Sequence, residues 1–433
     1  ANSPIYHLPI TFFMRITPIP HPLNATVRVP GSKSLTNRAL LIAALANGTT
    51  KLTNALFSDD SKYFAQALQT LGFDLQLDEA NSEMTVTGLG GKIPATKAEL
   101  FIGNAGTAAR FLSAFLTLGH GEFILDGDSR MRERPIGDLT DALSQLGVKL
   151  ESTNNCPPVK ISSSGLQGGT TKIAGNISSQ FLSALLMVSP YAKSAIAIEL
   201  TTELNSKPYV DMTLGVMQDF DVEIERPDDS RFFIYPSTYS PILYYLIESD
   251  ASAASYFFAA PAICGGKVKV ENISWDSKQG DIAFLGILQQ MGCVVMEDDD
   301  SIEVHRPSSI VGIDINMRAI PDTAKTIAAI APFADSPTRI RGIASARHKE
   351  TDRVHATCTE LARLGVQVDE HEDGMTIYPC ETLQPATIQT YNDHRMAMAF
   401  SLIGLRFDGV TIENPSCVSK TFPNFFDVLE TLR

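Results

Sequence analysis

Six segments of this 433-residue chain repeat one pattern, and this repetition limits the possible folds more than any other feature. Each segment opens with a short knot rich in Gly, Ser, Asn or Asp and continues into an apolar, helix-like stretch. In the first five segments a strand, a loop, a second helix and another strand follow. The knots recur about every 70–75 residues, a period that favours six compact β-α-β-α-β-β units over a thin stacked repeat. They begin at Gly31, Gly103, Gly175, Ser249, Pro321 and Asn392.

The first helix of each unit is expected to be buried. Segments such as ALLIAALA, FLSAFLTL and FLSALLMV are apolar nearly all round, and a helix of this kind belongs in a core. The neighbouring strands alternate or are rich in β-branched residues, as in KVKVENIS. The sequence therefore predicts an α/β fold of the inside-out type, with helices inside and sheets outside. The polar knots at the starts of the inner helices would then point towards a common region.

Three units on each side of residues 246–250 predict two similar domains. We expect residues 1–13 to be an N-terminal extension, and a second chain crossing near residues 29–31. The predicted domains are a discontinuous one of residues 14–30 plus 250–433 and a continuous one of residues 31–249. Because ligands often bind between domains, the cleft between them is the expected site.

Charge and composition exclude several classes of function. The formal net charge is −14 and the isoelectric point about 5.0, which argues against nucleic acid or an anionic membrane as a partner. No apolar run is long enough to cross a bilayer. The six cysteines are scattered without a C-x-x-C pair, as expected for reduced thiols in a cytoplasmic protein. No ligand cluster indicates a metal, so none is expected.

The first knot, PGSKSLTNR, has the properties of an anion site. Backbone amides at a helix start have no intrahelical partner and lie at the positive end of the helix dipole. Lys33, Arg38 and the hydroxyls around them add charge and donors. The spacing is not that of a Walker A loop. The alternative is simple N-capping by Ser32 or Ser34, with the basic side chains in solvent.

Ten motifs in chain order resemble the 5-enolpyruvylshikimate-3-phosphate synthase family of enolpyruvyl transferases. The resemblance extends over nearly the whole chain beyond Met14. Single motifs are weak, but their complete order is specific. They are PGSKSLTNR, GNAGTAAR, RMRERPIG, ISSQFLSALL, SKPYVDMT, SDASAASYF, IPDTAKT, HKETDR, YNDHRMAM and SKTFP.

The resemblance implies a reaction between two anionic substrates. The 5-hydroxyl of shikimate 3-phosphate attacks C2 of phosphoenolpyruvate while C3 takes a proton, and the tetrahedral intermediate then expels phosphate. Neither a metal nor a cofactor is implied. Two unit charges 4 Å apart repel by about 4 kcal/mol at an effective dielectric of 20, so many cations are needed. The resemblance also implies a cytoplasmic monomer that glyphosate inhibits at the phosphoenolpyruvate site.

Site residues are implied motif by motif. Those expected to bind shikimate 3-phosphate are Lys33, Ser34, Arg38, Ser178, Ser179, Gln180, Ser206, Tyr209, Asp322, Ser345 and Lys349. Those expected to bind phosphoenolpyruvate are Lys33, Asn104, Gly106, Arg134, Gln180, Arg353, Arg395 and Lys420. A side chain at Gly106 would crowd the ligand. Asp393 and His394 are expected to orient Arg395.

Two carboxylates are the expected catalytic pair. Asp322 would accept the proton of the 5-hydroxyl, and Glu350 would deliver a proton to C3. Asp322 has an alternative role as the N-cap of the fifth inner helix, and Glu350 as an ion-pair partner. Lys33 and Lys420 are alternative proton donors.

Two positions depart from the family pattern. Ser345 stands where many members have Asn, and Phe111 where many have Pro. Both leave affinity and glyphosate sensitivity open. Three other functions are considered: a nucleotide-sugar enolpyruvyl transferase, an inactive phosphometabolite-binding protein and an RNA-processing relative. The nucleotide-sugar enzyme carries a reactive cysteine, and the candidate region here, RMRERPIG, has none. The presence of Asp322, Glu350 and Lys420 argues against an inactive binding protein. The acidic isoelectric point argues against an RNA-processing relative.

Overall fold

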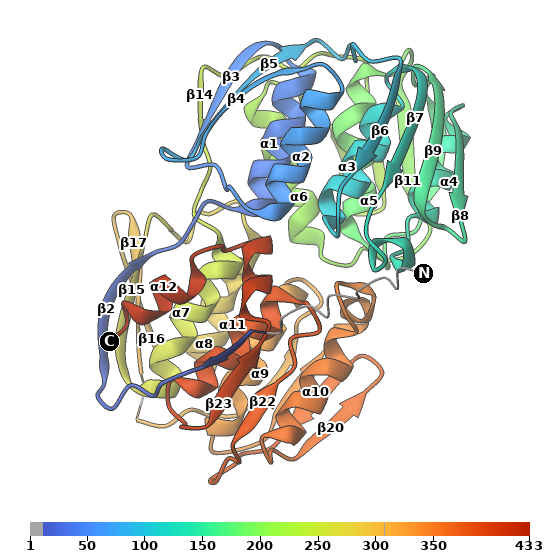
Figure 1. The fold of residues 1–433 in the computed structure, drawn as a ribbon. Helices are drawn as coiled ribbons and strands as arrows, with labels where there is room; N and C mark the ends of the chain where they lie inside the picture. Colours follow the sequence, from blue (N-terminus) through green and yellow to red (C-terminus); the bar gives the residue numbers. More distant parts are fainter. Residues whose placement is uncertain (1–11, 307) are drawn as a thin grey trace, which may run out of the picture.

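The chain forms an upper and a lower lobe that meet at a waist (Figure 1). The structure is a computed structural model that describes residues 12–306 and 308–433. One apolar core contains residues from Leu35 to Ile247 and defines the upper lobe. The other combines residues between Ile16 and Val29 with residues between Ala251 and Leu432 and defines the lower lobe. We propose that these lobes are the two domains expected from the repeat; the expected extension lies largely outside the described residues.

Three sheets share one strand order within a continuous stretch of chain. A parallel pair is followed by two antiparallel strands, the last two in reversed chain order. The sheets are β6 (Lys97–Phe101), β7 (His120–Asp126), β9 (Cys156–Ser164), β8 (Lys149–Thr153); β10 (Gly169–Ile173), β11 (Ile196–Leu200), β13 (Arg231–Ile234), β12 (Glu225–Asp228); and β18 (Asp314–Asn316), β19 (Thr338–Arg341), β21 (Gly374–Ile377), β20 (Val368–His371).

The other three sheets are completed by strands from distant parts of the chain. The first unit takes β14 from just before the second crossing, the fourth takes β2, and the sixth is closed by β1. The sheets are β14 (Tyr244–Leu246), β3 (Asn47–Thr53), β5 (Glu83–Leu89), β4 (Asp74–Asp78); β2 (Leu23–Arg28), β15 (Gly266–Glu271), β17 (Ser301–His305), β16 (Val294–Asp298); and β22 (Ala386–Ile388), β23 (Val410–Glu413), β1 (Phe13–Arg15).

The helices form two sets. The first helices of the units contact one another inside each lobe, with the sheets around them, which confirms the predicted inside-out fold (Figure 1). They are α1 (Lys33–Leu45), α3 (Gly106–Leu116), α5 (Ser179–Val188), α7 (Ala251–Cys264), α9 (Ala324–Ile330) and α11 (His394–Gly404). The second helices are α2 (Asp59–Thr70), α4 (Gly137–Gln145), α6 (Lys207–Asp219), α8 (Phe284–Gln290), α10 (Arg353–Arg363) and α12 (Phe425–Glu430).

Short 3-10 turns precede or follow several of these helices. They are η1 (Met131–Glu133), η2 (Ser189–Tyr191), η3 (Gly280–Ala283), η4 (Pro321–Thr323), η5 (Ala331–Phe333), η6 (Ala344–His348) and η7 (Pro415–Lys420).

The two chain crossings lie side by side. Gly31 and Ser249 form an antiparallel bridge, flanked by hydrogen bonds from Ser32 N to Glu248 O (2.8 Å) and from Asp250 N to Pro30 O (2.9 Å). A β-carbon at Gly31 would lie 1.8 Å from Asn54 O, so only glycine fits here. Helices α1 and α7 start directly beyond this bridge. Their N-termini are therefore held next to each other at the waist.

Candidate active site

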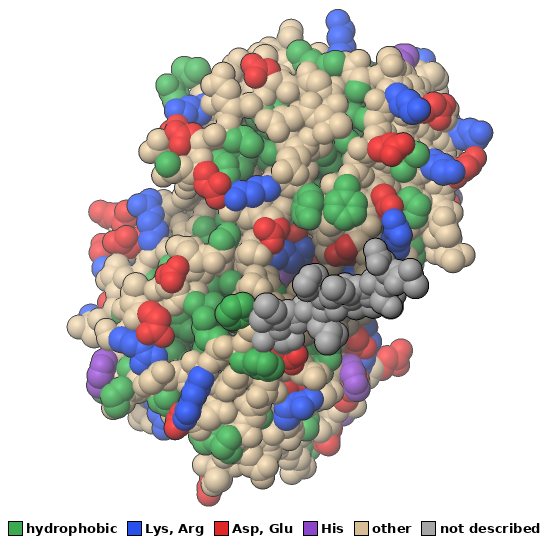
Figure 2. All heavy atoms as spheres, viewed as in Figure 1, with side chains coloured by type: hydrophobic (Ala, Val, Ile, Leu, Met, Phe, Trp, Pro, Cys, Tyr) green, Lys and Arg blue, Asp and Glu red, His purple; other side chains and the backbone are tan. Residues whose placement is uncertain are grey.

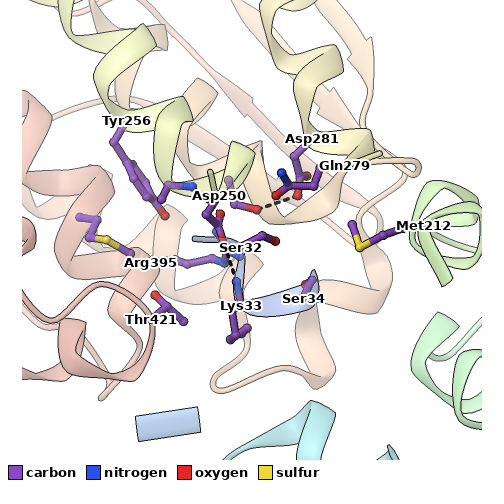
Figure 3. Close-up of a pocket in the computed structure, with 13 residues that line it drawn as sticks. Ser32, Lys33, Ser34, Met212, Asp250, Tyr256, Gln279, Asp281, Arg395 and Thr421 are labelled. Carbon is purple, nitrogen blue, oxygen red and sulfur yellow. Dashed lines mark hydrogen bonds between the residues drawn. The ribbon is translucent and has the colours of Figure 1, made fainter. Parts of the chain in front are cut away.

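The start of α1 is a capped helix end that also faces a pocket. Ser32 is the N-cap and accepts a hydrogen bond from Leu35 N, which agrees with the capping alternative. Asp250 caps α7 through Ala253 N (2.8 Å) and also accepts from Lys33 N (3.1 Å). Ser32, Lys33, Ser34, Asp250 and Arg395 line one pocket (Figure 3). Capping and ligand access thus occur together at this end.

Arg353 is the centre of a buried network in the lower lobe. Its guanidinium donates to Asp322 Oδ1 (3.0 Å), Glu350 Oε2 (2.7 Å) and Asp393 Oδ2 (2.6 Å). Arg395 donates to the second oxygen of Asp322 (3.0 Å). One arginine therefore fixes both expected catalytic carboxylates.

Asp393 contacts the expected arginine, Arg395, and also a second one, Arg353. Its side chain caps α11 through Arg395 N (2.9 Å), but its contacts with a guanidinium are to Arg353. His394 is buried, burial holds its pKa well below the usual value, and neither ring nitrogen has a hydrogen-bond partner among the described residues. Arg395 is thus held at its backbone by Asp393 and at its guanidinium by Asp322.

Lys420 and Asp60 join the two lobes. The Lys420 ammonium, at the end of η7, donates to Asp60 Oδ1 (2.6 Å) and to Asn104 O (2.7 Å) in the upper lobe. It also lies 3.9 Å from Glu350 Oε1. The other Asp60 oxygen lies 3.4 Å from the Lys33 ammonium. Asp60 is thus a buried counter-charge to two predicted site cations, and no quoted motif contains it.

The upper-lobe part of the expected phosphoenolpyruvate site is built on the start of α3. Arg134 donates to Asn104 O (3.0 Å) and Asn104 Oδ1 (2.8 Å). A β-carbon at Gly106 would lie 2.5 Å from Arg134 Nη2 and 3.1 Å from Arg110 Nη1. Gly106 therefore leaves room for the Arg134 guanidinium, a more specific reason than crowding of a ligand.

The residues expected around shikimate 3-phosphate are only partly brought together. Ser178 caps α5 through Gln180 N (3.2 Å), and Gln180 reaches Thr107 Oγ1 at 3.5 Å. Ser179, Ser206 and Ser345 are buried. No side-chain hydrogen bond of Ser345 or Lys349 is found within residues 12–306 and 308–433.

Arg38 does not present its donors to the cleft. It is buried and donates to Thr213 Oγ1 (2.7 Å), Ser34 O (2.9 Å) and Tyr209 O (3.0 Å), and its guanidinium lies 5.2 Å from the centre of the Phe111 ring. Burial lowers its pKa to about 10. In this arrangement Arg38 holds the backbone of Tyr209 and of Ser34 through their carbonyl oxygens. Phe111 lies within the unbroken helix α3, is buried, and packs its ring against the Arg38 guanidinium.

Tyr209 is hydrogen-bonded to Asp281, a carboxylate that none of the sequence motifs contains. Its hydroxyl donates to Asp281 Oδ2 (2.7 Å), which also accepts from Ser252 Oγ (2.6 Å). Burial, and then the charge of Asp322, raise the pKa of Asp281 to about 6. The contact joins α6 of the upper lobe to η3 of the lower lobe. A Gly-Asp pair after Gln279 was the only sequence signal for it.

The electrostatics of Asp322 and Glu350 follow from the cations around them. Burial alone would raise both pKa values. Arg395, Lys349 and Arg353 instead hold the pKa of Asp322 well below its usual value. Arg353, Arg134 and Lys420 do the same to Glu350. Both carboxylates are ionised, so the ion-pair alternative for Glu350 is realised; the capping alternative for Asp322 is not, because no backbone N–H of α9 donates to it.

Acidic and basic side chains lie together in the recess between the lobes (Figure 2). Such a cleft suits the joining of two anionic substrates with proton transfer to and from carboxylates. Two inside-out lobes with such a site agree with the enolpyruvyl transferase class that the sequence motifs indicate. Among the described residues, no helix is both long and apolar enough to cross a bilayer.

Comparison with known proteins identifies the family within this class. The sequence profile of EPSP synthase (3-phosphoshikimate 1-carboxyvinyltransferase) matches residues 18–429, so the chain belongs to this family. This confirms the predicted function, enolpyruvyl transfer to shikimate 3-phosphate in the shikimate pathway.

Curated relatives and solved structures agree. A 3-phosphoshikimate 1-carboxyvinyltransferase of Trichormus variabilis is 49% identical over 407 residues, 94% of this chain and 95% of the relative. That of Shewanella denitrificans is 50% identical over 408 residues, 93% of this chain and 95% of the relative. An EPSP synthase structure from Acinetobacter baumannii has a TM-score of 0.80 at 24% identity, with 96% and 97% of the chains covered, which confirms the fold.

Proposed function

We propose that the cleft between the lobes is the active site in which the enolpyruvyl group of phosphoenolpyruvate passes to the 5-hydroxyl of shikimate 3-phosphate. The observation that carries this assignment is the attachment of Asp322 and Glu350 to the same guanidinium, that of Arg353. The reaction needs a base that acts on shikimate 3-phosphate and an acid that acts on phosphoenolpyruvate. One arginine between them fixes their separation.

Phosphoenolpyruvate is assigned to the cations that meet at Asn104. Arg134 and Lys420 approach this residue from opposite lobes, and Arg353 and Arg395 lie beyond them. Its phosphate and carboxylate would replace the contacts that Asp60 and Glu350 now make with Lys420, and charge-assisted bonds of this kind are strong. Lys33 completes the set through its link to Asp60.

Shikimate 3-phosphate is assigned to the hydroxyl-rich side of the cleft. Ser178, Ser179 and Ser206 supply donors for its phosphate from the upper lobe, and Lys349 and Ser345 from the lower. Lys33 and Ser34 line the adjoining pocket (Figure 3). Tyr209 and Gln180 lie between the two substrates. Arg38 is assigned an indirect role through Tyr209 and Ser34, because its buried guanidinium donates to their carbonyl oxygens.

The proton steps follow from the ionisation of the two carboxylates. Asp322, ionised and held by Arg395, accepts the proton of the attacking hydroxyl. Glu350 delivers a proton to C3 once it has taken one up in the ligand-bound site. Lys33 and Lys420 are the alternative donors. Loss of phosphate from the tetrahedral intermediate completes the reaction.

The test is phosphate release from phosphoenolpyruvate, measured with and without shikimate 3-phosphate. Release that requires this acceptor supports the assignment. Release that requires a nucleotide sugar instead would favour the sister transferase, and no release with either acceptor would favour an inactive binding protein. We also propose that the protein is a cytoplasmic monomer, and that glyphosate competes with phosphoenolpyruvate for Arg134, Arg353, Arg395 and Lys420.

A further inference from the structure

An arginine outside all the assigned site residues bridges the two lobes at the catalytic segment. Arg130 lies just before η1 in the upper lobe. Its Nη2 donates to Lys349 O (2.9 Å) and its Nε to Glu350 O (3.0 Å), both in the lower lobe. Its Nη1 is paired with Glu133 (2.8 Å). The guanidinium thus donates to two successive backbone carbonyls, one of which belongs to Glu350, the proposed acid.

The segment that Arg130 contacts is irregular and is held by side chains. Lys349 to Asp352 lies between η6 and α10 and belongs to no helix or strand. Among the described residues, neither of these two carbonyls accepts a backbone hydrogen bond. An irregular segment without backbone pairing depends on side chains for its position. Asp352 at its far end pairs with Arg347 (2.9 Å) and caps α10 through His355 N (3.0 Å). The Lys349 and Glu350 carbonyls are held by Arg130.

The position of this backbone decides where the Glu350 carboxylate lies. Glu350 reaches Arg353 at 2.7 Å and Lys420 at 3.9 Å, so a small backbone shift changes both contacts. Arg134 is four residues beyond Arg130 on the same turn and belongs to the proposed phosphoenolpyruvate site. One turn of the upper lobe thus presents a ligand cation and at the same time holds the acid of the lower lobe.

We propose that Arg130 is a positioning residue that sets the Glu350 carboxylate for proton transfer to C3 when the lobes are together. The inference depends on the proposed role of Glu350. A planar guanidinium matches two adjacent carbonyls, whereas an ammonium offers a single point of charge. Lys at this position is therefore expected to restore only part of the function.

The chain supplies a matched control. Arg132 is two residues away on the same turn and pairs with Asp126 (2.5 Å) inside the upper lobe. Among the described residues, no hydrogen bond or ion pair joins it to the lower lobe. Arg132→Ala removes the same side chain from the same turn and is expected to keep kcat within about twofold of the unaltered enzyme.

The experiment compares Arg130→Ala, Arg130→Lys and Arg132→Ala in the full chain. Turnover is measured together with exchange of the C3 hydrogens of phosphoenolpyruvate in deuterated water, which reports the proton step. Arg130→Ala is expected to lower both by about 10–100-fold, less than the 10²–10⁴-fold expected for loss of the acid itself, with a smaller change in KM for shikimate 3-phosphate. Arg130→Lys is expected to lie between. Equal effects of Arg130→Ala and Arg132→Ala, or loss of turnover with normal exchange, would overturn the proposal.

A double variant separates this proposal from the role of Glu350. If Arg130 acts through Glu350, adding Arg130→Ala to Glu350→Gln causes little further loss, because coupled residues are not additive. A full multiplicative loss would overturn the positioning role. Near-normal turnover of Glu350→Gln alone would overturn the acid assignment, and a loss in Arg130→Ala would then have to act through Lys349. Thermal unfolding of each variant excludes a folding defect as the cause.

Discussion

Gly106→Ala tests the phosphoenolpyruvate site with a single methyl group. The added β-carbon would lie 2.5 Å from Arg134 Nη2, and ordinary contact starts at 3.4 Å, so the guanidinium must move by about 0.9 Å. Arg134 is buried and held at 2.8 and 3.0 Å by Asn104, so this movement strains both hydrogen bonds. Overpacking of this kind costs about 1–3 kcal/mol, which corresponds to about 5–150-fold in a binding constant.

The assay is steady-state inhibition by glyphosate with phosphoenolpyruvate as the varied substrate. Glyphosate is slightly longer than phosphoenolpyruvate, so we expect competitive inhibition of the unaltered enzyme and a larger loss of affinity for glyphosate than for the substrate in Gly106→Ala. Gly286→Ala is the matched control, because it also adds a methyl to a helix, where nothing lies within 4 Å. Equal glyphosate constants before and after Gly106→Ala would refute the steric reasoning. If glyphosate does not inhibit the unaltered enzyme, Phe111, which packs against Arg38, would be the candidate cause of the tolerance.

Three further predictions concern protonation and closure. Asp322→Asn and Glu350→Gln should each lower turnover by about 10²–10⁴-fold while substrate affinity changes much less, as measured by steady-state kinetics; normal turnover of Glu350→Gln would move the C3 proton to Lys33 or Lys420. Asp281 has its pKa raised from 3.8 to about 6 in the native state, so its contribution to stability is fully present below pH 4 and is lost as the pH rises to about 6; Asp281→Asn should therefore gain stability relative to the unaltered enzyme between pH 4 and pH 7 by up to about 3 kcal/mol, and a constant difference in Tm across this range would contradict the assignment. Shikimate 3-phosphate should shift the lobes towards the arrangement described, because its phosphate joins serines of the upper lobe to Lys349 of the lower; an unchanged radius of gyration in solution scattering would count against closure.

The fold was largely predictable because its main determinant is local and repeated. Most inner helices contain a long, largely apolar stretch, and the knots mark where each helix starts, so burial and convergence follow from the sequence. The exchanged strands were not predictable in the same way. β2 and β14 read as ordinary strands, and only the adjacent crossings at Gly31 and Ser249 explain why each completes a sheet that starts elsewhere in the chain.

The cations of the site were easier to predict than their counter-charges. Lys33, Arg353, Arg395 and Lys420 stand in recognisable motifs of an acidic chain. Asp60 and Asp281 do not, since a single Asp at a helix start or in a turn is common. These acids also reduce the repulsion between cations across the unliganded cleft. Repulsion among unpaired cations would open the unliganded cleft, but Asp60 neutralises Lys33 and Lys420 across it, so much of that force is absent.

The cations around Glu350 explain how it can serve as an acid although they keep it ionised in the free enzyme. Its pKa is low because Arg353, Arg134 and Lys420 surround it. These are three of the cations assigned to phosphoenolpyruvate, whose phosphate and carboxylate would satisfy them. Once they face the ligand, burial becomes the dominant influence on Glu350, and burial raises the pKa of a carboxyl group. Asp322 has additional stabilisation from Lys349, and it stays ionised as a base. Binding of phosphoenolpyruvate would therefore separate two carboxylates that are alike in the free enzyme into an acid and a base.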